Sequence, residues 1–355
     1  MASMAIEDGI RILDRNIETL NINYFRYTNP VLSRVIMKTY HGMLKRRPEL
    51  WDYLYDNDSV KTKTLKFRNV LHKLNSAKLK KLIGWYKPDI IVCTQAFPCV
   101  AMAEYKRIQC ENIPIVGVVT DYGVHSYWVD PAVDLYIVPT EDTKKRLLDL
   151  GVKDEKVKII GIPVSPKFCM PLDRKRLRAK FGIDNSKPVA LLMGGSQGMI
   201  SMDEIVMQLV KLPVDMHLLV VCGVNKKLFK RLNRIRKKHK VNMHLYGYIN
   251  NIEELMSVSD FIITKPGGLT VTESLAKGLP MIIINPIPGQ EAMNTEYLIR
   301  KNAALKAKDV NDLVRHVENL INNPESLKQL KQAALGLSRP TSALEIAEKV
   351  IFWNK

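Results

Sequence analysis

FIITKPGGLTVTES, residues 261–274, joins a short apolar run to a helix-like stretch through two adjacent glycines. The apolar run is rich in β-branched residues, as buried parallel strands are. Glycine lets the backbone approach a phosphate closely, and the amides at a helix N-terminus donate hydrogen bonds to anions. A strand, a glycine turn and a helix in this order predict a doubly wound α/β domain with a phosphate-bearing ligand at its strand ends.

Similar apolar runs alternate with helix-patterned stretches over most of the chain. This alternation is typical of parallel βαβ units. In the second half the predicted strands are Val189–Met193, His217–Val221, Met243–Tyr246, Phe261–Thr264 and Met281–Asn285. In the first half they are Asp89–Cys93, Pro114–Val119 and Leu135–Val138. The proline-rich stretch from Gly161 to Pro171 has no periodicity and marks the domain boundary. We expect two Rossmann-like domains facing across a cleft, at 1–165 and 166–338, and a C-terminal helix at 339–355.

Length and composition agree with two soluble domains: 355 residues, 46% hydrophobic and 25% charged. The net charge of +18 favours anionic partners, namely nucleic acid, phosphorylated metabolites or anionic lipid. No recognition motif supports nucleic acid. No apolar run reaches the ~18 residues needed to cross a bilayer, and no signal-peptide pattern is present. Five cysteines without a CxxC pair predict reduced thiols and a cytoplasmic protein.

The N-terminal region differs from an ordinary doubly wound domain. Residues 1–13 have helical spacing, where such a domain normally opens with a strand and a glycine-rich turn. Residues 31–44 form an amphipathic segment followed by the basic residues Lys45, Arg46 and Arg47. This segment fits an interfacial membrane helix and an ordinary surface helix equally well.

A second glycine-rich loop, Gly194-Gly195-Ser196-Gln197-Gly198, directly follows a predicted strand. It fits a phosphate loop, and it also fits a plain connection from a strand to a helix. In the 261–274 motif, Glu273 is suited to accept hydrogen bonds from the vicinal hydroxyls of a ribose. As an alternative, Thr270 caps the helix and Glu273 closes a capping box.

A third loop, Pro286–Asn294, follows the next predicted strand. Its polar side chains Gln290, Glu291 and Asn294 are suited to the several hydroxyls of a hexose. Each of them also fits a solvated helix start. Three such loops at the ends of neighbouring strands are harder to explain without a ligand.

The motifs GGSQG, KPGGLTVTES and PGQEAMN, in this order, resemble the donor domain of a GT-B glycosyltransferase family. That family includes bacterial processive diacylglycerol glucosyltransferases, plant monogalactosyldiacylglycerol synthases and the peptidoglycan GlcNAc-transferase. The first-domain stretch TDYGVHSYW, residues 120–128, is similar to a motif of the glycolipid branch. The resemblance covers nearly the whole chain.

The resemblance implies an inverting enzyme that moves a hexose from UDP-glucose or UDP-galactose to diacylglycerol or glucosyl-diacylglycerol. It implies no metal and no other cofactor, because backbone amides and helix dipoles stabilise the leaving UDP. It also implies partners and a place in the cell: a diacylglycerol-type lipid on the anionic inner face of the cell membrane, with the protein peripheral and cytoplasmic. The implied donor-site residues are Gly194, Gly195, Ser196, Gln197, Gly198, Gly267 and Gly268 for the diphosphate, Glu273 for the ribose, and Gln290 with Glu291 for the sugar. Thr270 and Asn294 complete the predicted donor-binding residues.

In the first domain, Asp121 and His125 are the catalytic candidates that the resemblance implies. Histidine titrates in the right range for a general base, and a strand-end histidine is also often only a hydrogen-bonding residue. Members of the family begin with a strand and a glycine-histidine turn, which this sequence lacks, so we expect the chain as written to fold its first domain poorly. The competing functions are GlcNAc transfer to a lipid-linked peptidoglycan precursor and UDP-GlcNAc 2-epimerisation on the same fold.

Overall fold

The structure is a computed structural model that describes residues 1–29, 77–194, 201–239 and 241–353. The amphipathic segment 31–47 lies outside these residues. None of the described helices combines the length and the apolar character that crossing a bilayer requires. All five cysteines are described, and all are free thiols.

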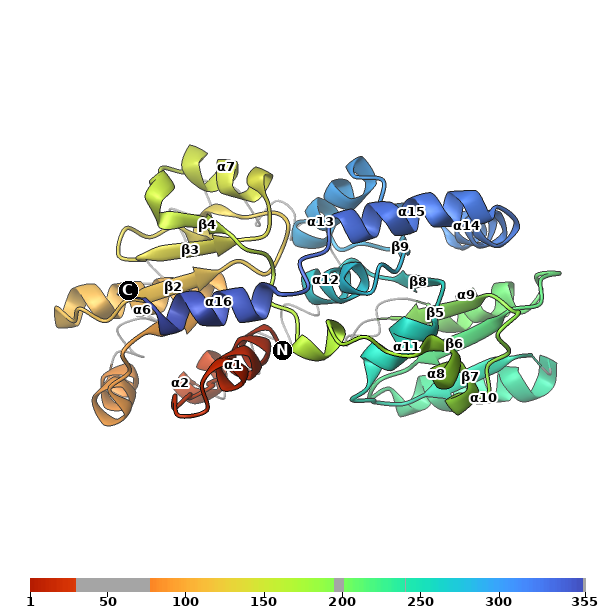
Figure 1. The fold of residues 1–355 in the computed structure, drawn as a ribbon, viewed down its shortest axis with the longest axis horizontal. Helices are drawn as coiled ribbons and strands as arrows, with labels where there is room; N and C mark the ends of the chain where they lie inside the picture. The colour runs from red at the N-terminus through yellow and green to blue at the C-terminus, as the bar shows by residue number, and fades with distance from the viewer. Residues whose placement is uncertain (30–76, 195–200, 240, 354–355) are drawn as a thin grey trace. The chain divides into compact units, whose positions relative to one another are not determined.

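The chain divides into two compact units, each with its own parallel sheet (Figure 1). Unit 1 comprises Met1–Pro166, Ile287–Gln290 and Thr341–Lys355. Unit 2 comprises Lys167–Pro286 and Glu291–Pro340. The fold class is therefore α/β with two Rossmann-like units.

In unit 1 the described strands form a four-stranded parallel sheet in the order β1-β2-β3-β4, so β1 is an edge strand of this sheet. The first three strands confirm the predicted ones, and β4 had no predicted counterpart. The elements are β1 Ile91–Cys93, β2 Ile115–Val118, β3 Leu135–Val138 and β4 Val157–Ile159, with helices α1 Ala2–Leu13, α2 Tyr24–Thr28, α6 Ala96–Gln109, α7 Glu141–Asp149 and α16 Ser342–Ile351 and the 3₁₀ turns η1 Ser126–Trp128 and η2 Asp154–Lys156.

Helices cover both faces of this sheet because alternate strand residues point to opposite sides. Val116 and Val118 of β2 join one apolar cluster with α1 and α16. Ile115 belongs to a second cluster that includes α6. Contact between α1 and α16 is close: a Cβ atom added at Gly9 would lie 2.7 Å from the Ala343 carbonyl oxygen. The C-terminal helix thus completes unit 1.

Unit 2 has a six-stranded parallel sheet in the order β10-β9-β8-β5-β6-β7. Its first strand, β5, lies between β6 and β8, so the order of connection reverses beside β5. The elements are β5 Val189–Met193, β6 His217–Val221, β7 Met243–Tyr246, β8 Phe261–Thr264, β9 Met281–Ile284 and β10 Ala304–Ala307, with α8 Arg174–Lys180, α9 Met202–Leu209, α10 Lys226–His239, α11 Ile252–Val258, α12 Gly268–Ala276, α13 Gln290–Arg300, α14 Val310–Asn322 and α15 Pro324–Gly336, and η3 Pro166–Phe168 at the start of the unit. The five predicted strands of this half are confirmed.

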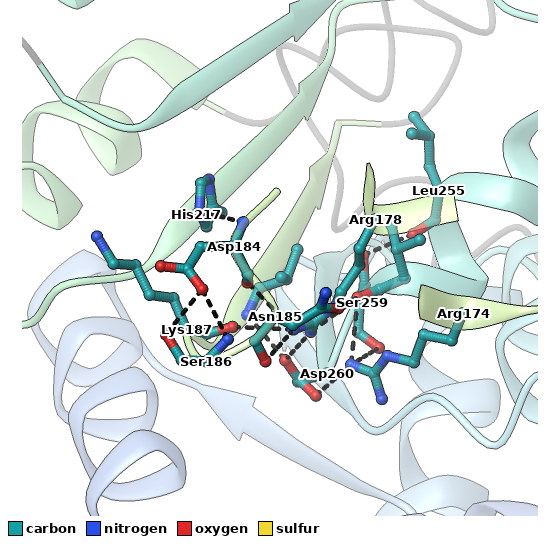
Figure 2. A network of polar contacts seen from close by, with 12 residues as sticks. Arg174, Arg178, Asp184, Asn185, Ser186, Lys187, His217, Leu255, Ser259 and Asp260 are labelled. Carbon is teal, nitrogen blue, oxygen red and sulfur yellow. Dashed lines mark hydrogen bonds and ion pairs between the residues drawn. The ribbon is translucent and has the colours of Figure 1, made fainter. Parts of the chain in front are cut away.

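A buried arginine braces the amino ends of these strands (Figure 2). The guanidinium of Arg178 donates to the carbonyls of Val258, Asn185 and Lys187 at 3.1–3.2 Å and to the Asp260 carboxylate at 3.0 Å. Because these partners come from α11 and from the segments before β5 and β8, Arg178 fastens α8 to the sheet. Burial lowers the pKa of Arg178, and Arg174 lowers it further, whereas Asp260 opposes the shift.

A histidine pair continues this network at the start of β6. His217 Nε2 accepts a hydrogen bond from the Asp184 amide at 3.1 Å, and its Nδ1 lies 3.2 Å from His244 Nε2. Since Nε2 accepts, the proton of neutral His217 is on Nδ1 and is donated to His244. Burial lowers the pKa of both imidazoles.

Candidate functional site

The topological switch of unit 2 lies between β5 and β8, and parallel sheets bind ligands outside the carboxyl ends of strands at such a point. Gly194 directly follows β5 and is buried, and the turn 265–267 directly follows β8. The structure therefore brings two of the three predicted loops to the switch. Gly195, Ser196, Gln197 and Gly198 lie outside the described residues.

The turn after β8 leaves its backbone open. Gly267 is the N-cap of α12 and has an ordinary φ of −65°. A Cβ atom added there would meet no atom within 4 Å. Neither conformation nor packing requires glycine at this position, and the first-turn amides of α12, from Gly268 onward, have no partner within the helix. The bare turn is suited to an anionic group that approaches the backbone closely.

The capping-box alternative for this motif is wrong. The helix begins at Gly268, so Thr270 is inside its first turn and cannot be the N-cap. Neighbouring hydroxyls bond back along the helix, Thr272 to the Gly268 carbonyl and Ser274 to the Thr270 carbonyl, each at 2.8 Å. Glu273 is therefore free of the capping role that the alternative gave it.

Glu273 is a half-buried carboxyl group on the second turn of α12. Burial raises the pKa of this carboxyl to about 7, the Lys167 ammonium opposes the rise, and the Glu253 carboxylate adds to it. Burial disfavours the ionised form of this carboxyl group, and hydrogen bonds donated by a ligand would stabilise that form. Such a carboxylate is suited to accept hydrogen bonds from the two neighbouring hydroxyl groups of a diol.

Two charged residues near Glu273 were not predicted. Lys167, on the first turn of unit 2, lies 2.9 Å from Glu253 on α11 and donates to the Asn250 carbonyl at 2.7 Å. The pair joins the beginning of the unit to the loop after β7. Lys167 and Glu253 stand far apart in the chain with no motif around them, so the sequence held no signal for them.

The loop after β9 has a constrained backbone conformation. Asn285 and Gly289 both have positive φ, 49° and 85°, and Gln290 is the first residue of α13. Asn294 is fully buried and donates to the Pro266 carbonyl at 2.9 Å. This hydrogen bond joins α13 to the turn after β8, and a shared site at these strand ends stays a prediction.

An ion pair makes a second link between these loops. Lys265, buried at the end of β8, lies 3.1 Å from the Glu291 carboxylate. Burial lowers the pKa of Lys265, and Glu291 opposes that shift. The sequence named Glu291 but missed Lys265, although a lysine placed directly after a buried strand was a usable signal. Gln290 is half-buried, and its contact with a sugar stays a prediction.

In unit 1 the catalytic candidates lie on the loop that follows β2. Asp121 is half-buried, and His125 is buried and immediately precedes η1. The His125 ring packs edge-on against Tyr127 with 5.6 Å between ring centroids. One loop therefore carries both residues, as the motif at 120–128 predicted.

Tyr136 of β3 fixes the far end of this loop, and the sequence gave no reason to single it out. Its hydroxyl donates to the Trp128 carbonyl at 3.0 Å and accepts from the Asp130 amide at 2.9 Å. Arg107 of α6 pairs with the Asp130 carboxylate. Burial raises the pKa of Tyr136, so the hydroxyl keeps its proton and remains a donor. The loop that carries His125 is thus anchored to β3 and α6.

The described residues hold no group of three His, Cys, Asp or Glu side chains that could bind a metal ion. The chemistry that the two strand-end regions offer comes from amides, carboxyl groups, one lysine and one histidine. In unit 2 these suit a sugar nucleotide. In unit 1 the imidazole of His125 and the carboxyl group of Asp121 are suited to accept a proton.

Known proteins share this organisation. Residues 2–164 match the family described as monogalactosyldiacylglycerol (MGDG) synthase, and residues 189–348 match the glycosyltransferase family 28 C-terminal domain. The chain is 32% identical to the processive diacylglycerol beta-glucosyltransferase of Bacillus pumilus over 330 residues, which are 93% of this chain and 85% of that protein.

Solved structures with lower identity share the fold. The S. aureus MnaA structure with UDP has a TM-score of 0.64 at 16% identity and covers 81% of both chains. MurG of Acinetobacter baumannii has a TM-score of 0.60 at 15% identity and covers 79% of both chains. These likenesses support the GT-B architecture alone. The sequence relatives and the two family matches establish that the chain belongs to the glycosyltransferase family that contains the processive diacylglycerol β-glucosyltransferases.

Proposed function

We propose that the protein transfers a hexose from a UDP-sugar to diacylglycerol or glucosyl-diacylglycerol, with inversion at the anomeric carbon. The observation that carries the proposal is the 32% identity, over 93% of the chain, to a diacylglycerol glucosyltransferase. The open turn at Gly267 and the carboxyl group of Glu273 supply the matching chemistry at the strand ends of unit 2.

In this proposal unit 2 binds the donor. The diphosphate lies against the bare turn at Gly267, contacts the first-turn amides of α12 from Gly268 onward, and contacts the glycine loop that begins at Gly194. Glu273 accepts hydrogen bonds from the two ribose hydroxyls. Gln290 and Glu291 hold the hexose, and the Lys265 pair and the Asn294 hydrogen bond keep their loop in position.

The reaction is a single displacement. The acceptor hydroxyl oxygen forms a bond to the anomeric carbon as the bond from that carbon to the β-phosphate oxygen breaks. The hydroxyl proton passes to a base, for which His125 and Asp121 are the candidates. The negative charge that develops on UDP is stabilised by amides and the positive end of the α12 dipole, so the step needs no metal ion.

The acceptor lipid places the enzyme at a membrane, and we propose a peripheral position on the anionic inner face. Support comes from the net charge of +18, because anionic lipid surfaces attract basic proteins.

The test is transfer in mixed micelles that contain diacylglycerol, with labelled UDP-glucose and UDP-galactose in parallel reactions. We expect label in a lipid product whose new linkage is β, as NMR of the anomeric proton would show. An α linkage would contradict inversion. Absence of lipid-bound label with both donors, or conversion of the UDP-sugar without acceptor, would contradict transfer to lipid.

A further inference from the structure

Helix α10, Lys226–His239, carries an unusual concentration of positive charge on the surface of unit 2. It contains no acidic residue. Seven of its basic residues are exposed: Lys226, Lys227, Lys230, Arg231, Arg234, Lys237 and Lys238. At 100° per residue these seven fall within an arc of roughly 140°, so they form one continuous stripe about 18 Å long. We call these seven residues the α10 stripe.

The other side of α10 accounts for its place in the fold. Leu228 and Leu232 are buried and belong to the apolar core of unit 2, and Phe229 and Ile235 pack against that core. The helix packs beside α9 and β7. The stripe therefore lies on the side of α10 that does not pack on this core.

Little inside the protein neutralises this charge. Arg231 lies 3.1 Å from Asp203 on α9, and both side chains are well exposed, so the pair contributes little. Within the described residues, no ion pair joins the other six members of the stripe to an acid. Six neighbouring ammonium and guanidinium groups repel one another, which favours a partner that presents many negative charges on a broad surface.

Two exposed apolar side chains lie in the neighbouring loops at the start of α10. Val224, just before the helix, is 76% exposed, and Tyr248, in the loop after β7, is 71% exposed. The two loops are neighbours, since β6 pairs with β7 and a Cβ atom added at Gly247 would lie 3.8 Å from the Gly223 carbonyl oxygen. A basic helix face beside exposed apolar and aromatic side chains is the combination that binds lipid interfaces.

We infer that the α10 stripe, with Val224 and Tyr248 at its end, is a docking surface of unit 2 for an anionic phospholipid bilayer. The stripe supplies attraction to lipid phosphates, and the two apolar side chains enter the interfacial layer. The choice of lipid as partner rests on the proposed function. Nucleic acid is less favoured because the sequence contains no nucleic-acid recognition motif.

The test changes four residues spread along the stripe, Lys226, Lys230, Arg234 and Lys237, to glutamine. A matched control changes four exposed basic residues elsewhere in unit 2: Lys175, Arg176, Lys328 and Lys331. Sedimentation with phosphatidylglycerol vesicles, with phosphatidylcholine vesicles and with a single-stranded RNA oligomer measures binding. Each basic residue near an anionic surface strengthens binding roughly fivefold, so we expect the stripe variant to bind phosphatidylglycerol at least about tenfold more weakly, and the control clearly less so.

Activity and stability measurements separate this inference from the proposed function. We expect the stripe variant to retain wild-type thermal stability, UDP affinity and transfer in neutral detergent micelles, and to lose transfer on phosphatidylglycerol vesicles. A wild-type protein that transfers no hexose in either setting would contradict the proposed function while the sedimentation result still stands. Equal vesicle binding by wild type and stripe variant, an equal loss in the control, or loss of RNA binding alone would overturn the docking surface.

Discussion

Two charged groups that unit 2 largely removes from water, Arg178 at the amino end of the sheet and Glu273 at the carboxyl end, differ in how far the protein compensates their charge. At the amino end, Arg178 and Asp260 meet each other and a set of backbone carbonyls, so the charges are compensated within the protein (Figure 2). At the carboxyl end, Glu273 keeps a pKa raised to about 7 beside a glycine turn whose backbone is open. A compensated network stabilises a fold, whereas an uncompensated group beside open amides is suited to a ligand.

The largest expected effect is on stability, from Arg178→Met. Removing the guanidinium leaves Asp260 with one arginine partner and removes the donor to the carbonyls of Asn185 and Lys187. Loss of one partner of a buried pair costs about 3–5 kcal/mol, and we expect about 3 because Arg174 still pairs with Asp260. Urea unfolding measures the change. UDP affinity of the folded variant should be unchanged. Weaker UDP binding without loss of stability would show that the amino end of the sheet binds the ligand rather than stabilises the fold.

Glu273→Ala should have the opposite effect to Arg178→Met: it should weaken UDP binding and leave stability unchanged or slightly higher. We expect UDP binding to weaken by ~1.5–3 kcal/mol, the range for hydrogen bonds to a charged group. The free energy of unfolding should hold or rise slightly, since a carboxyl group in an unfavourable environment is removed. Calorimetric titration with UDP tests this, with Glu296→Ala on the exposed face of α13 as the control. Unchanged UDP affinity would remove Glu273 from the donor site.

The raised pKa of Glu273 predicts how donor binding depends on pH. The ionised carboxylate accepts from the ribose, so binding is strongest above pH 7 and weakens as the carboxyl group is protonated below it. Between pH 8 and pH 6 we expect UDP affinity to fall about tenfold, as titration of one group requires. In Glu273→Gln the part of this dependence due to residue 273 should vanish. Equal pH profiles for the two proteins would contradict the assignment.

The smallest effect concerns the histidine pair at the amino end. The folded-state pKa of His217 and of His244 lies below the unfolded value of about 6.5, so the unfolded chain takes up protons first as pH falls. This contribution to stability is complete above about pH 7 and is lost as pH falls through 6.5 toward the folded pKa. Urea midpoints at pH 7.5 and 5.5 should differ less for His244→Gln than for wild type. An equal change in urea midpoint in the two proteins would show that the histidine pair does not contribute to the pH dependence of stability.

Sequence predicted the fold well where strands are long or rich in β-branched residues, as in Phe261–Thr264 and Met281–Ile284. It missed β4, which has three residues, and β10, which has two alanines and no β-branched residue. Their places are set by pairing with β3 and β9 rather than by local preference.

The site was predictable to the same extent. Loops at strand ends carry a local signal, which singled out Gly267, Glu273 and Asn294 as candidates. Lys167 and Glu253 are brought together only by the tertiary fold, and Tyr136 supports its loop from a neighbouring strand. Residues of this kind have no pattern of their own, because their role depends on partners distant in the chain.

The most direct test of the contrast between the two sheet ends is hydrogen–deuterium exchange of the wild-type protein with and without UDP. Backbone amides that contact a ligand exchange more slowly when it is bound. We predict that UDP slows exchange in peptides covering 264–274 and 285–294 and leaves peptides covering 174–187 and 258–261 unchanged. Slower exchange at the amino end, or no change at 264–274 at saturating UDP, would contradict the account.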